Sequence, residues 1–298
     1  MNDSLSEYHI LVDALAGELP SIPLIMNDLL KIVSDSNAAL FGVRDIIKKD
    51  KAIFSKVLKS ANSFEIRQGS DERIILISDA IQRLGFERIK KIVLNTSVFT
   101  LFEELKGNSQ FKLQDLWMHS CGVAIATECL AKRYESKYFE HAYSCGLLHD
   151  LGKVAKVKYH QETFFKEINH ALETNSCLYS TELNLNSLRH DILGAMIIQK
   201  WGISPIVEQT TRWHHTAKKT ERIEVNDQEI HKLIDLLKLA NQIVKDLQFG
   251  NSGYNALTEL SPEVFKRRKI EKEEFNECKE IVQSAFDNEA ENLTLFFK

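Results

Sequence analysis

The chain has 298 residues, with 38 lysines and arginines against 42 aspartates and glutamates, and a formal net charge of −4. This balance excludes a global electrostatic attraction to nucleic acid or to an anionic membrane, although a local basic face stays open. Hydrophobic residues make up 44% and charged residues 27% of the chain, as in ordinary soluble globular proteins. The length suits one large domain or two modest ones, and we expect two.

Few helix-breaking residues interrupt the chain, which contains 4 prolines and 12 glycines. Apolar residues recur mostly at helical spacing, so we predict an all-α fold. No apolar run reaches the ~18 residues that span a bilayer, and the N-terminus lacks the apolar core of a signal peptide. The cysteines form no C-x-x-C pair, which indicates reduced core thiols in a cytoplasmic protein. They are Cys121, Cys129, Cys145, Cys177 and Cys278.

The first hundred residues predict a series of helices without a cluster of metal-binding or acid/base residues. We expect helices at residues 1–18, 23–33, 43–49, 52–61, 78–85 and 86–105. The prolines of Leu19-Pro20-Ser21-Ile22-Pro23 separate the first two, because each proline disfavours helix in the residue before it. Gly85 is expected to stop the fifth. Asn62 and Ser63 are most simply interpreted as a helix C-terminal cap and turn.

The second half of the chain carries the residues that point to chemistry. Asp115 and His119 are four residues apart, so they share one helical face and could place a carboxylate and an imidazole on one metal ion. An exposed Asp–His pair, or a buried histidine bonded to a backbone carbonyl, is the alternative. His149 and Asp150 are adjacent at the end of an apolar run. Such a pair offers two ligand types on one turn, but it is also common without a metal.

Further histidines stand at predicted helix ends. His190 opens a helix that ends at Gly202, and the pair His214 and His215 ends the next one. Later helices are expected at residues 230–247 and 271–288. Five histidines and two carboxylates from separate helices fit a metal pair held in a helical bundle, and their ligand types suit iron, manganese or zinc. The candidate ligands are Asp115, His119, His149, Asp150, His190, His214 and His215.

The order and spacing of several motifs resemble the HDOD family, an all-helical branch of the HD phosphohydrolase superfamily. They are L-P-S-I-P at 19–23, K-D at 49–50, V-L-K-S-A-N-S at 57–63 and A-I-Q-R-L-G at 80–85. The candidate ligands, with H-D-L-G-K at 149–153, resemble the HD superfamily and, in ligand set, its HD-GYP branch. The resemblance covers residues 19–245 and implies a helical bundle of the HD-domain type. We expect an N-terminal helical subdomain at 1–110, an HD-like core with the ligands at 111–250, and C-terminal capping helices at 251–298.

The resemblance also implies roles for individual residues. His119 would match the first ligand histidine, and His149 and Asp150 the signature pair, with Asp150 bridging two ions. Lys153 would contact a phosphate. Lys153 and Asp150 would be the two candidate catalytic residues. Asp115 would match an acidic residue found in some three-metal relatives. The ligands of the second ion would be His190, His214 and His215.

Two departures from the superfamily pattern bear on activity. The last ligand is an aspartate in the superfamily, whereas the best match here is Asn241, whose neutral amide oxygen would be a weaker ligand. After the histidine pair, hydrolases of cyclic di-GMP carry a glutamate and a Gly-Tyr-Pro loop, whereas residues 216–220 read T-A-K-K-T. These differences argue against that substrate and favour loss of hydrolysis over loss of metal binding.

The resemblance therefore implies a bacterial, cytoplasmic signal-transduction module with one or two divalent ions and little or no hydrolysis. Its expected partners are a signalling protein and a phosphate-containing ligand, and we expect no binding to a membrane. The alternative is a metal-dependent phosphohydrolase that acts on a phosphoester or nucleotide through a metal-activated water. A nucleic-acid adaptor is supported only by the basic cluster at residues 265–269, for which a solvated face is the simpler interpretation.

Overall fold

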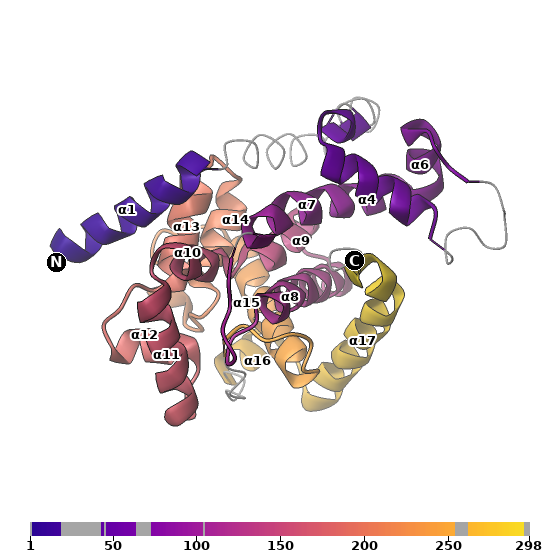
Figure 1. Ribbon diagram of the computed structural model, residues 1–298. Coiled ribbons are helices and arrows are strands. Elements are labelled where there is room, and N and C mark those ends of the chain that lie inside the picture. Colours follow the sequence, from indigo (N-terminus) through magenta and orange to yellow (C-terminus); the bar gives the residue numbers. More distant parts are fainter. Residues whose placement is uncertain are drawn as a thin grey trace. The chain divides into compact units, whose positions relative to one another are not determined.

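The computed structural model describes residues 2–18, 43–44, 46–63, 73–103, 105–253 and 262–294. Every regular element in these ranges is helical, which confirms the all-α prediction (Figure 1). The helix expected at residues 23–33 lies outside the described residues, whereas residues 43–44 and 46–49 are helical as expected. None of the described helices is both long and apolar enough to cross a membrane.

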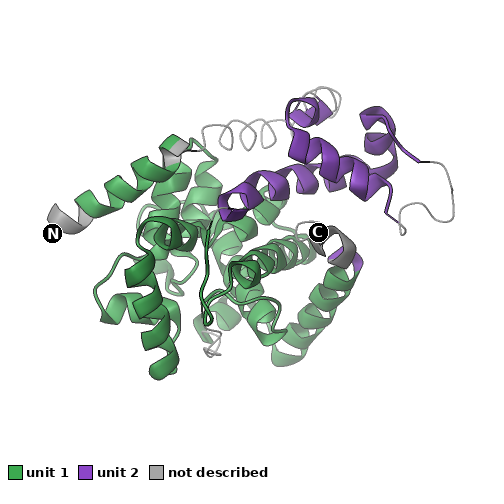
Figure 2. Ribbon diagram, in the orientation of Figure 1, with its two compact units in different colours: residues 1–19, 104–287 green, residues 20–103, 288–298 purple. Residues whose placement is uncertain are grey.

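The chain divides into two compact units (Figure 2). Unit 1 comprises Met1–Leu19 and Glu104–Asp287, and unit 2 comprises Pro20–Glu103 and Asn288–Lys298. This division groups the first helix with the histidine-rich part of the chain, whereas the sequence suggested boundaries near residues 110 and 250. Those domain boundaries stay predictions.

Unit 2 is built from α4 (Lys51–Ala61), α6 (Ile77–Leu84) and α7 (Phe86–Glu103), each of which packs against the other two. Asp50 caps α4, because its side chain accepts hydrogen bonds from the amides of the first turn. Gly85 ends α6 with a positive φ of 77°, which glycine adopts without steric cost, so its expected role as a stop is confirmed.

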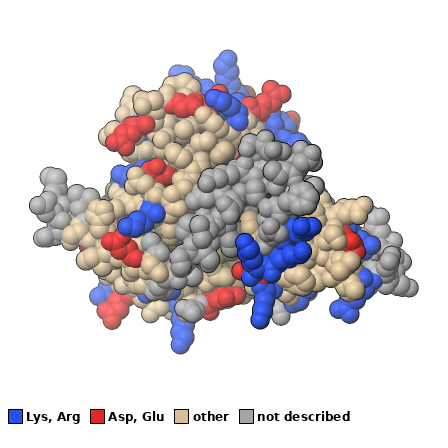
Figure 3. All heavy atoms as spheres, turned by 90° about the horizontal axis from the view of Figure 1, so that it is seen from above, with Lys and Arg blue, Asp and Glu red and all other residues tan. Residues whose placement is uncertain are grey.

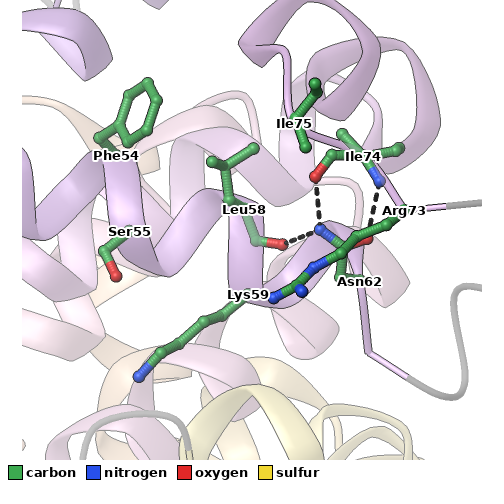
Figure 4. Close-up of a pocket in the computed structure, with 8 residues that line it drawn as sticks. All are labelled: Phe54, Ser55, Leu58, Lys59, Asn62, Arg73, Ile74 and Ile75. Carbon is green, nitrogen blue, oxygen red and sulfur yellow. Dashed lines mark hydrogen bonds between the residues drawn. The ribbon is translucent and has the colours of Figure 1, made fainter.

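Asn62 links two segments of unit 2. It follows α4 as the expected C-terminal cap, and its side chain also exchanges two hydrogen bonds with the backbone of Ile74, at 2.8 and 2.9 Å (Figure 4). A hollow of about 640 Å³ lies beside this link, with Lys59 and Arg73 among its lining residues. The asparagine therefore holds the extended segment before α6 against the end of α4.

Unit 1 holds the remaining helices. They are α1 (Asn2–Glu18), α8 (Leu113–Arg133), α9 (Phe139–Leu148), α10 (Leu151–Tyr159), α11 (Gln161–Glu173), α12 (Leu178–Asn184), α13 (His190–Lys200), α14 (Pro205–Trp213), the short 3-10 helix η1 (Lys219–Glu221), α15 (Gln228–Asp246), α16 (Pro262–Arg268) and α17 (Lys272–Thr294), of which only the part up to Asp287 belongs to unit 1.

The centre of unit 1 is α9, which packs against α8, α14 and α15. This helix is buried on nearly all sides, as its apolar composition requires. Gly146 permits the closest approach, because a Cβ there would lie 2.5 Å from backbone atoms of α8. All five cysteines are free, and Cys145 on α9 is fully buried. Burial raises the pKa of the Cys145 thiol to about 12, so this thiol is an inert core residue.

Helix α1 belongs to the same unit and packs on α10 and α13. Its buried face consists of Tyr8, Leu11, Val12 and Leu15. The Tyr8 hydroxyl accepts a hydrogen bond of 2.6 Å from the backbone amide of Arg189, the residue before α13. The first helix is therefore tied to the start of α13.

The basic cluster at residues 265–269 is less solvated than the sequence suggested. Arg267 and Arg268 both pair with the fully buried carboxylate of Asp235 on α15, which also pairs with Arg222. Burying Asp235 requires such partners, so two of the basic side chains fasten α16 to α15. Basic and acidic side chains both occur on the face seen in Figure 3, in keeping with the nearly balanced charge.

Candidate metal centre

The candidate ligands come from four positions along the helices of unit 1. His119 lies within α8, whereas His149 and Asp150 form the turn between α9 and α10. His190 is the first residue of α13, and His214 and His215 directly follow α14.

Gly152 explains why α10 and α13 can meet so closely. A Cβ at this position would lie 2.0 Å from the backbone oxygen of His190 and 2.9 Å from the backbone nitrogen of Gly194. Only glycine fits this approach, which brings the Asp150 end of α10 next to the first residue of α13. The glycine of the H-D-L-G-K motif is therefore explained by packing.

The carboxylate of Asp150 is the centre of the cluster, and its two oxygens face different histidines. Oδ1 lies 3.4 Å from Nε2 of His190 and 3.8 Å from Nε2 of His214. Oδ2 lies 3.3 Å from Nε2 of His149 and 3.9 Å from Nε2 of His119. One buried carboxylate thus stands between two groups of imidazoles, and each group presents its ligand atoms within 4.8 Å of one another.

Two histidines are oriented through the nitrogen that faces away from Asp150. Nδ1 of His149 lies 2.7 Å from the carbonyl oxygen of Gly146, and Nδ1 of His214 lies 2.7 Å from that of Thr211. Since a carbonyl only accepts, each Nδ1 carries the proton and each Nε2 keeps its lone pair. This is the arrangement by which proteins prepare imidazoles as metal ligands.

His215 is the partly exposed member of the cluster. Its ring stacks on Tyr179 with 4.3 Å between the centroids and 18° between the planes, and its Nε2 lies 2.9 Å from Nε2 of His190. The ammonium group of Lys238 on α15 donates a hydrogen bond of 3.0 Å to the backbone oxygen of His215. These contacts fix both the ring and the backbone of this residue.

Burial keeps several of the imidazoles neutral. Desolvation is the largest cause that lowers the pKa of His119, His214 and His215 well below 6.5, with neighbouring histidines adding to the effect. For Asp150, burial by itself raises the pKa, but the neighbouring His149 and Lys153 outweigh it and hold the pKa well below 3.8. Neutral imidazoles around an ionised carboxylate are the protonation states that a metal cation requires.

Two buried residues that the sequence did not single out support His190. Glu182 on α12 lies 2.7 Å from Nδ1 of His190, and Lys156 on α10 lies 2.7 Å from the other oxygen of Glu182. Burial raises the pKa of Glu182, but His190 and Lys156 lower it to about 2. No signal in the sequence marks these residues, because a glutamate on a short polar helix and a lysine among other lysines resemble solvent-exposed positions.

The donor set fits a divalent cation. Several buried atoms of this cluster have no hydrogen-bond partner, and leaving such an atom unsatisfied costs about 1–3 kcal/mol. A cation would satisfy them, since imidazole nitrogens and a carboxylate suit iron, manganese or zinc. The atoms are Oδ1 of Asp150 and the Nε2 atoms of His119, His149 and His214.

Of the remaining sequence candidates, Lys153 contacts this cluster directly. Lys153 pairs with Oδ2 of Asp150 at 2.8 Å and donates to the backbone oxygen of Ser252 at 2.9 Å. Asn241 on α15 is 8% exposed, and its side-chain oxygen has no hydrogen-bond partner. Asp115 is half-buried one turn before His119 and does not belong to either group of ligand atoms. Ligand roles for Asn241 and Asp115 stay predictions.

Comparison with known proteins points to one family. The model of the HDOD domain matches residues 19–217. An uncharacterized protein of Treponema pallidum is 23% identical over 283 residues, which are 94% of this chain. The chain spans about half of that protein's length, 52%.

Solved structures share the fold. An HDOD domain protein of unknown function from Geobacter sulfurreducens is 22% identical, with a TM-score of 0.71 and 98% of each chain covered. A candidate signal transduction protein from Marinobacter aquaeolei has 18% identity and a TM-score of 0.73, with 98% of this chain and 65% of that chain covered. A candidate metal-dependent phosphohydrolase from Shewanella amazonensis has 19% identity and a TM-score of 0.51, with 94% and 99% covered.

Proposed function

Because the chain belongs to the HDOD domain family, we propose that it is a regulatory module of bacterial signal transduction that holds divalent metal at the Asp150 cluster and hydrolyses little or nothing. The observation that carries the metal site is the set of buried, unpaired nitrogen and oxygen atoms around Asp150. The ions would be held by the histidines on either side of Asp150, with iron, manganese or zinc as the suitable metals.

Two features support weak or absent turnover. Lys153 pairs with Asp150 Oδ2, so an ammonium group competes with a cation for that oxygen. Asn241 offers a neutral amide oxygen where an anionic ligand would hold a second cation more strongly. A cation held by few anionic ligands is bound weakly, and it can act as a Lewis acid only while it is bound. Weak binding of the second cation would therefore limit hydrolysis.

The setting of the module follows from the same proposal. The similarity to a candidate signal transduction protein supports a signalling protein as the partner, and the location that goes with this proposal is the bacterial cytoplasm. The lysine at the metal cluster supports a phosphate-containing ligand, because an ammonium group binds phosphate as a point charge.

The test begins with the metal content of the purified protein, measured by mass spectrometry, beside His190→Ala and a control, His170→Ala. His170 lies on α11 outside the cluster, so its replacement should leave the metal content unchanged. We expect bound metal in the wild type and a lower content in His190→Ala. A wild type without metal, after growth and purification in metal-supplemented medium, would refute the metal site.

A metal-dependent phosphohydrolase is the second candidate, favoured by the carboxylate that faces two histidine groups and by the similarity to a candidate metal-dependent phosphohydrolase. Hydrolysis of bis(p-nitrophenyl) phosphate separates the two candidates. The regulatory proposal expects none in the wild type and a gain in Asn241→Asp. Wild-type hydrolysis that disappears in His149→Ala would instead establish the enzyme.

A further inference from the structure

The two groups of histidines around Asp150 are supported very differently. The first group, near Oδ1, contains His190, His214 and His215, and the second group, near Oδ2, contains His119 and His149. The difference lies in the residues behind the imidazoles, which determine how well each ring is oriented before a cation arrives.

Glu182 supports the first group through a fully buried set of charges. One carboxylate oxygen lies 2.7 Å from Nδ1 and 3.2 Å from the backbone nitrogen of His190. The other lies 2.7 Å from the ammonium of Lys156, which also contacts the carbonyl of Leu188 at 2.6 Å and the carboxylate of Glu167 at 2.6 Å. A carboxylate on Nδ1 fixes the tautomer of His190 and makes its Nε2 a better electron donor.

The other members of the first group are also held in place. His214 donates from Nδ1 to the carbonyl of Thr211, and His215 is held by its stack on Tyr179 and by Lys238 at its backbone. A cation entering this group would therefore find three imidazoles already held in position and Oδ1 of Asp150, and few rotamers would have to be fixed on binding. The proton that Nε2 of His215 shares with Nε2 of His190 across 2.9 Å would have to leave as the cation binds.

The second group is less well prepared. Neither ring nitrogen of His119 has a hydrogen-bond partner, so nothing described here fixes its tautomer. Oδ2 of Asp150 is engaged by the Lys153 ammonium at 2.8 Å. A cation in this group would have to displace that ammonium or share the carboxylate with it, and two like charges in a buried site repel each other strongly.

We propose that Glu182 is a positioning residue that makes the group of His190, His214 and His215 the first and tighter cation position, whereas Lys153 keeps the second position weak. The inference rests on the proposed metal binding and adds an order of occupancy to it. The protein takes up one ion tightly and a second only at higher concentration.

Calorimetric titration of the chelator-stripped protein with Zn²⁺ tests this order, with Glu182→Gln as the first variant. Removing such a supporting residue weakens metal binding by about 10–100-fold, so the tight event should weaken by that factor. Glu167→Gln is the matched control, because Glu167 contacts Lys156 and not His190. It should leave the tight binding event unchanged, because Glu167 has no contact with a ligand histidine.

Lys153→Met tests, independently of Glu182, the proposal that Lys153 keeps the second cation position weak. It should strengthen the weaker Zn²⁺-binding event and leave the tighter one unchanged. Histidine tautomers read from long-range ¹H–¹⁵N spectra should show the Nδ1–H form of His190 in the wild type and a changed pattern in Glu182→Gln. If that variant does not fold, His190→Ala must abolish the tight event and His149→Ala only the weak one.

Four outcomes overturn the inference while the metal site itself stands. They are an unchanged tight event in Glu182→Gln, equal weakening in Glu167→Gln, an unchanged weak event in Lys153→Met, or loss of the tight event in His149→Ala. A wild type that binds no Zn²⁺ refutes the proposed function instead, so the two failures are distinguishable.

Discussion

Replacing Lys156 by methionine should destabilise the protein strongly. The ammonium is fully buried and lies 2.6 Å from the carboxylate of Glu167, 2.7 Å from that of Glu182 and 2.6 Å from the carbonyl oxygen of Leu188. Methionine fills a similar volume but leaves two buried carboxylates without their counter-charge. Removing one partner of a buried ion pair costs about 3–5 kcal/mol.

The loss of unfolding free energy should be measured by urea denaturation at neutral pH, followed by circular dichroism. In thermal unfolding, a cost of this size lowers the melting temperature by about 6–20 °C, at roughly 2–4 °C per kcal/mol. Lys166→Met is the control, because Lys166 is exposed on the neighbouring helix α11 and its replacement should change the free energy of unfolding by less than about 0.5 kcal/mol.

A double variant sharpens this test. Adding Glu167→Gln to Lys156→Met removes one of the two stranded charges, so part of the lost stability should return. The reasoning is refuted if Lys156→Met costs less than about 1 kcal/mol, the range of an exposed ion pair, because the lysine would then not be neutralising buried charge.

Three other changes should alter stability in defined ways. The unfolded, metal-free chain protonates histidines below pH ~6.5, whereas imidazoles whose folded pKa is lowered stay neutral. Below pH ~6.5 the unfolded state therefore binds up to three more protons than the folded state. The stability from these histidines is fully present above that pH and is lost as the pH falls. The free energy of unfolding should fall by up to about 4 kcal/mol per pH unit below it, measured by urea denaturation between pH 7.5 and 5. The histidines concerned are His119, His214 and His215. Gly152→Ala should cost at least about 1–3 kcal/mol and lower the metal content, because its Cβ would meet the backbone of His190, whereas Gly17→Ala, with open space, should do neither. Asn62→Ala should cost about 2–3 kcal/mol, at roughly 1 kcal/mol for each hydrogen bond lost, and should speed proteolysis near Ile74; unchanged proteolysis would contradict the link.

The sequence by itself determined the helical class and the residues of the cluster. Helical periodicity is a local property, so the element types could be predicted without tertiary information. The helical spacing of Asp115 and His119, the histidines at helix ends and the H-D-L-G-K motif were sufficient to nominate a set of ligands. The structure brings six of them together, namely His119, His149, Asp150, His190, His214 and His215.

Only the tertiary structure decided how these residues are supported. Glu182 and Lys156 are polar residues without periodic signal, and their burial depends on how α10, α11 and α12 pack. The asymmetry around Asp150 has the same origin, because the sequence cannot tell which carboxylate oxygen Lys153 will engage. Burial and partner choice are set by contacts between residues distant along the chain, and these contacts determine which imidazoles are prepared to receive a cation.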